Sequence, residues 1–173
     1  MNALARVGMA HLLASRWEEA ADSFSQSLAN SRERRINLSS VPRLLALLAD
    51  AQLGGGLGSQ ARANAREALE LARQEGLRDD ECLARLALAR ALRATEGVSA
   101  RDAIESQLDA AATIVEETGI AAFAPFVAEE RAALARMIGD EAGWERSLRE
   151  AQRLFAEMGA APRAARLTRE LGP

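Results

Sequence analysis

The sequence predicts an all-α protein built from helical hairpins. Of its 173 residues, 49% are hydrophobic but only 3% are aromatic, and 39 are alanine. Small side chains let helices approach closely, and leucine fills the gaps between them. No segment alternates apolar and polar residues with the period of two that marks a half-buried strand.

Three similar segments support this prediction. Residues 68–76, 111–119 and 151–159 each end on a glycine, and these glycines lie 43 and 40 residues apart. Glycine ends helices well because it adopts the left-handed conformation without a Cβ penalty. A recurring helix end at this interval indicates a repeated two-helix unit.

Boundary signals divide the first half of the chain. Ser15 and Glu18 form a capping-box pattern before a helix, Ser40 precedes Pro42, and Gly58-Ser59 opens the next helix. The first helix has no convincing N-cap. It also carries Met9, Leu12 and Leu13 beside its expected core residues Leu4 and Val7. This apolar surplus predicts either an interface or contacts within the groove of the fold.

Similar signals divide the second half. The acidic run 79–81 suits the positive end of a helix, Ser99 with Asp102 predicts another cap, and Gly139-Asp140 separates two helices. We therefore expect nine helices, at 2–14, 17–34, 41–53, 59–75, 80–95, 100–118, 122–138, 141–158 and 162–171.

Apolar stripes at helical spacing predict the core. In the last helix Ala164, Leu167 and Leu171 share one side, and arginines occupy the other, which suits a solvated cap. The pairs of stripes expected to face each other are Leu45, Leu48 and Ala49 with Ala61, Ala65 and Ala68; Leu83, Leu86 and Ala87 with Ile104, Leu108 and Ala111; and Phe126, Val127, Leu134 and Ile138 with Trp144, Leu148, Ala151 and Phe155.

The first unit resembles the tetratricopeptide repeat (TPR). The residues that carry this resemblance are Leu4, Val7, Gly8, Trp17, Ala20 and Phe24, with His11 and Ser27 as departures. It implies a right-handed α-α superhelix, a TPR-like solenoid of about four hairpins and a capping helix. The single domain would have units at about 1–38, 39–78, 79–120 and 121–160 and a cap at 161–173. The intervals of 43 and 40 residues between the recurring glycines are longer than the roughly 34 residues of a TPR unit. A HEAT-like array therefore remains the alternative.

Three stretches resemble the C-terminal repeat regions of bacterial multidomain proteins that join a class III adenylate or guanylate cyclase to an ATPase. They are residues 10–20, 124–131 and 149–171. The resemblance implies a non-catalytic interaction or regulatory scaffold at the C-terminal part of a larger signalling protein. The alternative is a passive structural extension without a ligand of its own.

The TPR resemblance also implies a groove for a protein or peptide, which could be a preceding domain of the same polypeptide. The residues expected to line it are Met9, Leu12, Leu13, Arg43, Asp50, Leu53, Leu88 and Leu92.

Catalytic and cofactor signals are weak. His11 and Cys82 are the only histidine and cysteine and lie in different units, so we expect no metal, no catalytic residue and no internal disulfide. The glycine run 54–58 resembles a phosphate loop, but the chain has no lysine and the run follows a helix, which predicts a turn. Adjacent carboxylates at 18–19, 116–117 and 129–130 are expected on solvated faces.

The remaining partner classes are also disfavoured. A net charge of −3 and a pI of about 5.4 oppose nucleic-acid binding. The longest apolar stretch, 44–49, is too short to span a membrane, and Arg6 and His11 interrupt any signal-peptide core. We therefore expect a cytoplasmic protein without a cofactor that is a monomer or a weak homodimer.

Overall fold

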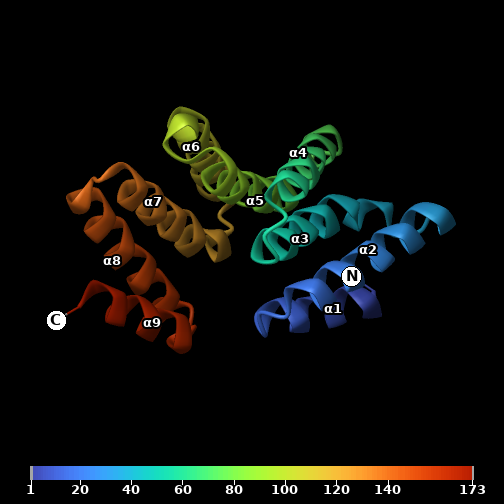
Figure 1. The fold of residues 1–173 in the computed structure, drawn as a ribbon, viewed down its shortest axis with the longest axis horizontal. Helices are drawn as coiled ribbons and strands as arrows, with labels where there is room; N and C mark the ends of the chain where they lie inside the picture. Colours follow the sequence, from blue (N-terminus) through green and yellow to red (C-terminus); the bar gives the residue numbers. More distant parts are fainter. Residues whose placement is uncertain (1, 173) are drawn as a thin grey trace.

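The chain folds into an arch of packed α-helices (Figure 1). The structure is a computed structural model that describes residues 2–172, and this range holds nine α-helices and three short 3-10 helices without a strand. The α-helices are α1 (Ala3–Leu13), α2 (Trp17–Arg34), α3 (Val41–Gly54), α4 (Gly58–Gln74), α5 (Arg78–Glu96), α6 (Arg101–Thr118), α7 (Ala124–Ile138), α8 (Glu141–Glu157) and α9 (Ala161–Leu171); the 3-10 helices are η1 (Leu38–Ser40), η2 (Gly97–Ala100) and η3 (Ala121–Phe123).

The helices predicted from the sequence agree with these bounds to within two residues at every end. Each α-helix packs against the next one along the chain. The first helices of successive hairpins also meet, because α3 contacts both α1 and α5, and α5 contacts α7. In Figure 1 α3, α5 and α7 line the inner side of the arch, while α4, α6 and α8 lie toward the outside.

Six helix ends share one turn. In each, a residue with positive φ follows the helix, and the next N–H donates to the carbonyl five residues earlier, for example Leu77 N to Ala72 O at 2.9 Å. This is the Schellman arrangement, which satisfies carbonyls that the helix leaves free. The positive-φ residues are Ser15, Arg35, Gly56, Gly76, Gly139 and Gly159.

Two predicted caps are wrong, and one unpredicted cap is present. Ser15 takes a left-handed turn conformation at φ 55° and makes no capping bond to α2. The Ser99 hydroxyl donates to the Glu96 carbonyl at 2.7 Å and so belongs to the end of α5 rather than to α6. Asn2 caps α1, because its Oδ1 accepts from Ala5 N at 3.0 Å and from the Ser27 hydroxyl at 2.9 Å.

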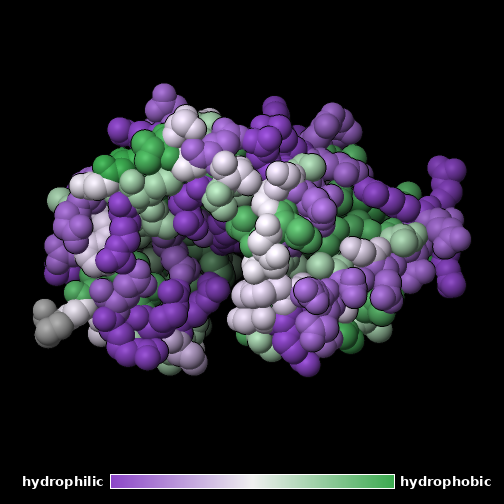
Figure 2. Space-filling model, viewed as in Figure 1, coloured by the Kyte–Doolittle hydropathy of each residue, from purple (hydrophilic) through white to green (hydrophobic). Residues whose placement is uncertain are grey.

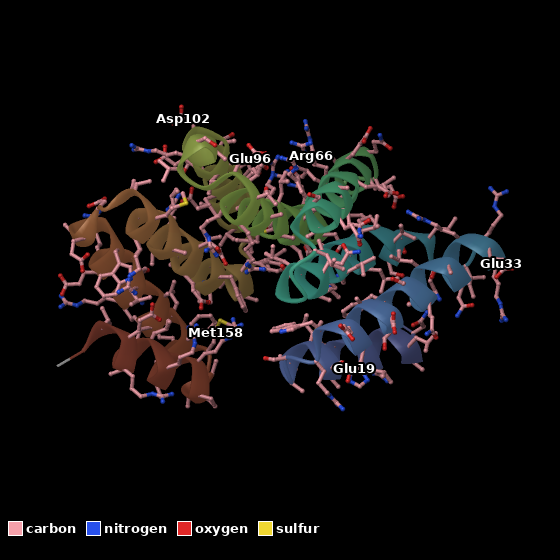
Figure 3. The ribbon with its side chains drawn as sticks, viewed as in Figure 1. Glu19, Glu33, Arg66, Glu96, Asp102 and Met158 are labelled. Carbon is pink, nitrogen blue, oxygen red and sulfur yellow. The ribbon has the colours of Figure 1, made fainter. Side chains whose placement is uncertain are left out.

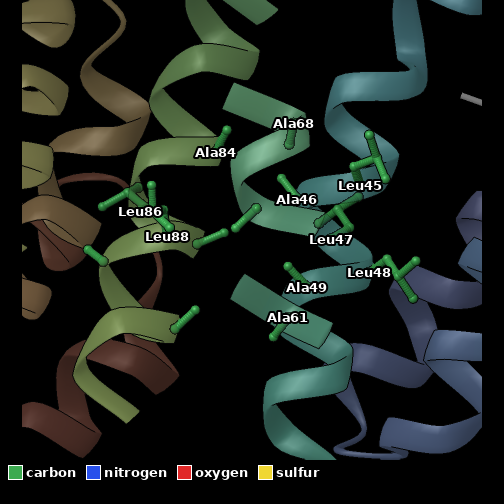
Figure 4. Packing of buried hydrophobic residues seen from close by; sticks show 14 of the residues in the cluster. Leu45, Ala46, Leu47, Leu48, Ala49, Ala61, Ala68, Ala84, Leu86 and Leu88 are labelled. Carbon is green, nitrogen blue, oxygen red and sulfur yellow. The ribbon is translucent and has the colours of Figure 1, made fainter. Parts of the chain in front are cut away.

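Two hydrophobic clusters form the core. The larger one runs through α1 to α6 and reaches one side of α7, and its centre is an alanine and leucine contact between α3, α4 and α5 (Figure 4). The predicted stripes of the second hairpin, which include Leu45 and Ala65, are all buried there. The smaller cluster belongs to α7, α8 and α9. The core is therefore divided at α7.

Helix α7 corrects the predicted fourth hairpin. Val127 and Leu134 pack into the larger cluster, whereas Ala128, Ala132 and Ala135 pack against α8. The prediction placed Val127 and Leu134 against α8. Because α7 is buried on two sides, its apolar residues cannot be assigned to one neighbour from their spacing alone.

Helix α1 buries small residues instead of the predicted large ones. Ala5 is fully buried, and a Cβ at Gly8 would lie 2.8 Å from the Phe24 ring, so glycine allows this close approach. Val7, expected in the core, is 47% exposed. Met9 and Leu12 pack partly against the core instead.

Candidate partner-binding groove

The molecule is hollowed between its two arms, which are α1 with α2 and α8 with α9 (Figure 2). The inner helices α3 and α5 form the roof of this hollow, and α7 continues it toward the C-terminal arm (Figure 1). A surface of this kind is where the sequence resemblance places a partner. Its residues therefore determine what the chain could hold.

The apolar residues expected in the groove divide into available and buried side chains. Leu13 is 78% exposed, whereas Met9, Leu12 and Leu53 are partly buried against the larger cluster. Leu88 and Leu92 are 6% and 5% exposed and pack inside that cluster. These last two contribute to the core and present almost no surface to a partner.

The polar residues expected in the groove are engaged with α5. Arg43 forms an ion pair with Asp80 at 2.5 Å, and Asp50 forms one with Arg90 at 3.0 Å. Both side chains remain partly exposed, with 42% of Arg43 and 19% of Asp50 accessible. They tie α3 to α5 at the surface where the hollow begins.

A charge ladder of Asp50, Arg90 and Glu130 links α3, α5 and α7. The Arg90 guanidinium donates to both Asp50 oxygens at 3.0 and 3.1 Å and, through Nε, to Glu130 at 2.5 Å. Arg93 also lies 3.4 Å from Glu130. Because a guanidinium is planar and offers several donors, one arginine can bind carboxylates from two neighbouring helices.

The ladder is largely shielded from water. The exposed fractions of the Arg90 and Glu130 side chains are 19% and 11%. Burial disfavours the charge on Arg90, but the carboxylates of Asp50 and Glu130 outweigh this effect and raise the pKa of the guanidinium. The Arg90 guanidinium therefore stays charged between the two carboxylates.

The structure corrects the expectation that Glu129 and Glu130 lie on a solvated face. Glu130 is buried by its contacts with Arg90 and Arg93, and Glu129, with 22% of its side chain exposed, pairs with Arg163 and Arg166 of α9. A signal for the ladder was present in the sequence, because Asp50, Arg90 and Glu130 are spaced at 40 residues. This spacing matches the interval between the second and third recurring glycines.

The other residues singled out by chemistry are the cysteine, the histidine and the glycine run. Cys82 is fully buried, and burial raises the pKa of its thiol to about 11, so it remains protonated at neutral pH. His11 is partly exposed on α1. The glycine run lies in the turn between α3 and α4, where Gly54 packs against the Trp17 ring and Gly56 takes a positive φ. Cys82 and the glycine run therefore have structural roles.

Comparisons with known proteins leave the family open. A scan of protein-family models and a search of curated protein sequences found no match to this chain. Within residues 2–172, none of the helices combines the length and apolar character needed to cross a bilayer. The inner face therefore has to be interpreted from its own chemistry, which is a charge-balanced centre with apolar side chains toward the arms.

Proposed function

We propose that this chain is a TPR-like solenoid that acts as a non-catalytic scaffold and binds a protein segment on the inner face of the arch. The single observation that carries the proposal is the order of the inner helices α1, α3, α5 and α7, each in contact with the next. A right-handed stack of hairpins produces such an inner row and a concave face beneath it.

Details of the first hairpin favour the TPR form over a HEAT-like array. Gly8 lies against Phe24, and Ala20 is fully buried, which are the roles that these positions have in the repeat that the sequence resembles. The shared Schellman turn after α1, α3, α4, α7 and α8 gives short connections within and between hairpins. Short connections favour antiparallel neighbours, as in a stacked array.

The chemistry of the inner face favours an extended or helical peptide as the ligand. Its polar centre already pairs acids with arginines. Each arm also carries an exposed apolar side chain, which is Leu13 at the end of α1 and Met158 after α8. Figure 3 labels Met158. Flexible methionine and leucine side chains adapt to varied apolar partners. A preceding domain of a cyclase or ATPase signalling protein is the partner that the sequence resemblance suggests.

Selection from a displayed peptide library tests this proposal. Binders selected on the chain should lose affinity when the inner face carries Asp50→Arg, Leu53→Glu and Leu13→Glu together. They should keep it when Arg66→Glu is placed on the outer side of α4 (Figure 3). Circular dichroism of each variant verifies that the helices are retained.

The passive-extension alternative gives a different result. A chain without a ligand of its own would yield no binders, or binders equally sensitive to inner-face and outer-face changes. Either result would contradict a dedicated inner surface. The Arg66 control separates the two readings because its substitution alters charge without touching the inner helices.

A further inference from the structure

A pocket lined by four helices lies beside Glu130 of the charge ladder. It has a volume of about 400 Å³, within the roughly 300–1,000 Å³ common for small-molecule sites. Its lining comes from the end of α5, from α7, from the first half of α8 and from the second half of α9. It contains none of the residues expected to line the inner groove, so a ligand in this pocket goes beyond the proposed function.

The bottom of the pocket is apolar. Trp144 and Leu148 of α8 and Leu167 of α9 close it, and each of them is at most 7% exposed. Ala133 and Met137 of α7 also line the pocket and remain partly exposed. Because a methionine side chain is flexible, it adapts to apolar groups of different shapes. The pocket can therefore hold the apolar body of a ligand.

The rim of the pocket is charged but balanced. Its lining holds three arginines and three glutamates, which are Arg93, Arg136, Arg166, Glu129, Glu130 and Glu170. Every oxygen of these three carboxylates already has an arginine nitrogen within 3.7 Å. The glutamates therefore have little capacity left to bind a cationic ligand.

The rim arginines, in contrast, have unused donors. Within residues 2–172, each of the three donates a single hydrogen bond, and that bond goes to one of the rim glutamates. A guanidinium offers several more N–H groups than this. The three side chains are 35%, 57% and 48% exposed, so a ligand can reach some of these groups. The hydrogen-bonding capacity that remains at the rim is that of a donor, which suits an acceptor-rich ligand.

Two further observations concern these donors. The Arg136 guanidinium lies 4.5 Å from the centroid of the Trp144 ring, and this cation–π contact holds it beside the apolar bottom of the pocket. The Nε of Arg93 is buried and has no hydrogen-bond partner among residues 2–172. A buried donor without a partner costs free energy, so Arg93 gains from an acceptor toward which its guanidinium can turn.

We propose that this pocket binds a small organic monocarboxylate with an apolar body. The carboxylate would accept charge-assisted hydrogen bonds from the rim arginines, and the apolar body would lie against Met137 and Trp144. A phosphate suits the pocket less well. Because the lining carries no net charge, the second negative charge of a phosphate monoester would be repelled by the three glutamates.

Naphthalene probes that differ only in their polar group test the proposal by calorimetry. They are naphthoate, naphthyl phosphate, naphthalenemethanol and naphthalenemethylamine. Naphthoate should bind about tenfold more tightly than each of the others. Another probe that binds as tightly as naphthoate, or no binding by any probe, would overturn the assignment to a carboxylate.

Substitutions at the rim test which groups bind the carboxylate. Arg93→Gln should weaken naphthoate binding about tenfold, while Glu130 keeps its pair with Arg90. Glu170→Gln should strengthen binding several-fold, because it releases donors of Arg136 and Arg166, and it should not change the affinity for naphthalenemethanol. Arg149→Gln is the matched control, since Arg149 pairs with Glu145 outside the pocket. Circular dichroism verifies that each variant is folded.

Filling the pocket tests its location. Ala133→Phe should abolish binding, whereas Ala63→Phe on the exposed face of α4 should leave it unchanged. In a Trp17→Phe chain, fluorescence of Trp144 should change on binding. Naphthoate binding that persists in both Ala133→Phe and Arg93→Gln, or that Glu170→Gln does not strengthen, would overturn the proposal. Inner-face peptide binders can be recovered whether or not naphthoate binds, so the two proposals fail separately.

Discussion

The large cluster of α1 to α6 and the small cluster of α7 to α9 are stabilised by different side chains. Alanine and leucine dominate the first, and Phe24 is its fully buried aromatic residue. The second has only three helices and uses larger groups, among them Trp144 and Phe155. The Phe126 and Phe155 rings meet edge to face with centroids 5.2 Å apart.

Arginine covers the aromatic side chains of the smaller cluster. The Arg136 guanidinium lies 4.5 Å from the Trp144 ring centroid, and that of Arg163 lies 4.7 Å from the Phe126 centroid. Such cation–π contacts let a charged surface close a small core. The small cluster therefore depends on a few large side chains, whereas the large one distributes its stability over many small contacts.

Truncating one aromatic side chain should give the largest effect. Phe155→Ala removes a 1% exposed ring from the smaller cluster and should cost about 3–5 kcal/mol. We expect α7 to α9 to lose structure while α1 to α6 stay helical, as measured by circular dichroism and amide exchange.

Leu45→Ala in α3 is the matched change in the larger cluster, because Leu45 is also 1% exposed. It should cost about 2–5 kcal/mol and lower the stability of the whole chain together. Identical unfolding patterns for both variants would remove the distinction between the two clusters.

The charge ladder should give the next largest effect, because it joins the two parts of the molecule. Arg90→Met leaves Asp50 and Glu130 without their shared partner and should destabilise the fold by about 2–3 kcal/mol. Arg149→Met removes only an exposed pair with Glu145 and should cost less than about 0.5 kcal/mol. Urea unfolding measures both.

A triple substitution sharpens this result. Asp50→Leu, Arg90→Met and Glu130→Leu together remove all three charges and should recover most of the stability lost by Arg90→Met alone. If the triple variant is less stable than Arg90→Met, the ladder stabilises the folded state by more than the mutual compensation of its three charges.

Titration of Cys82 should give a smaller effect that is confined to alkaline pH. Its pKa is about 11 in the folded chain, so the folded state keeps a proton that the unfolded state loses above about pH 9. Stability should therefore be unaffected below pH 8 and fall by about 2 kcal/mol as the pH rises from 9 to 11. Cys82→Ala should lack this additional loss in pH-dependent urea unfolding.

The turns should give the smallest effects. Ser15 and Arg35 adopt positive φ without being glycine, so Ser15→Gly and Arg35→Gly should each raise stability by roughly 0.5–1 kcal/mol. Gly76→Ala should lower it by about 1 kcal/mol, since nothing but backbone conformation opposes the new methyl group. In thermal unfolding, the melting temperature should rise for Ser15→Gly and Arg35→Gly and fall for Gly76→Ala. Shifts of the same sign in all three variants would contradict a turn conformation shared by these positions.

The sequence predicted helix positions well because periodic apolar stripes and turn glycines are local signals. It predicted neighbours less well. The spacing of Val127 and Leu134 in the sequence is the same whether they face α8 or the larger cluster. Likewise, Leu88 has the same helical spacing whether its side chain lines a groove or packs in the core. Asn2 and Ser15 were misjudged because a cap depends on backbone conformation that residue type alone does not specify.

The candidate site was predicted in outline but not in its chemistry. Arg43 and Asp50 were identified on α3, while their partners Asp80 and Arg90 were not. Long-range ion pairs have no local sequence signal, and only the 40-residue spacing of the ladder offered one.

Residue-resolved native-state amide exchange tests the division of the molecule most directly. The account predicts that amides in α7, α8 and α9 open together at a lower free energy than those at the centre of α3 and α5, and that Arg90→Met lowers the opening free energy of the first group more than that of the second. If both groups of amides open at the same free energy, in the wild-type chain and in the Arg90→Met variant, this division of the molecule is contradicted.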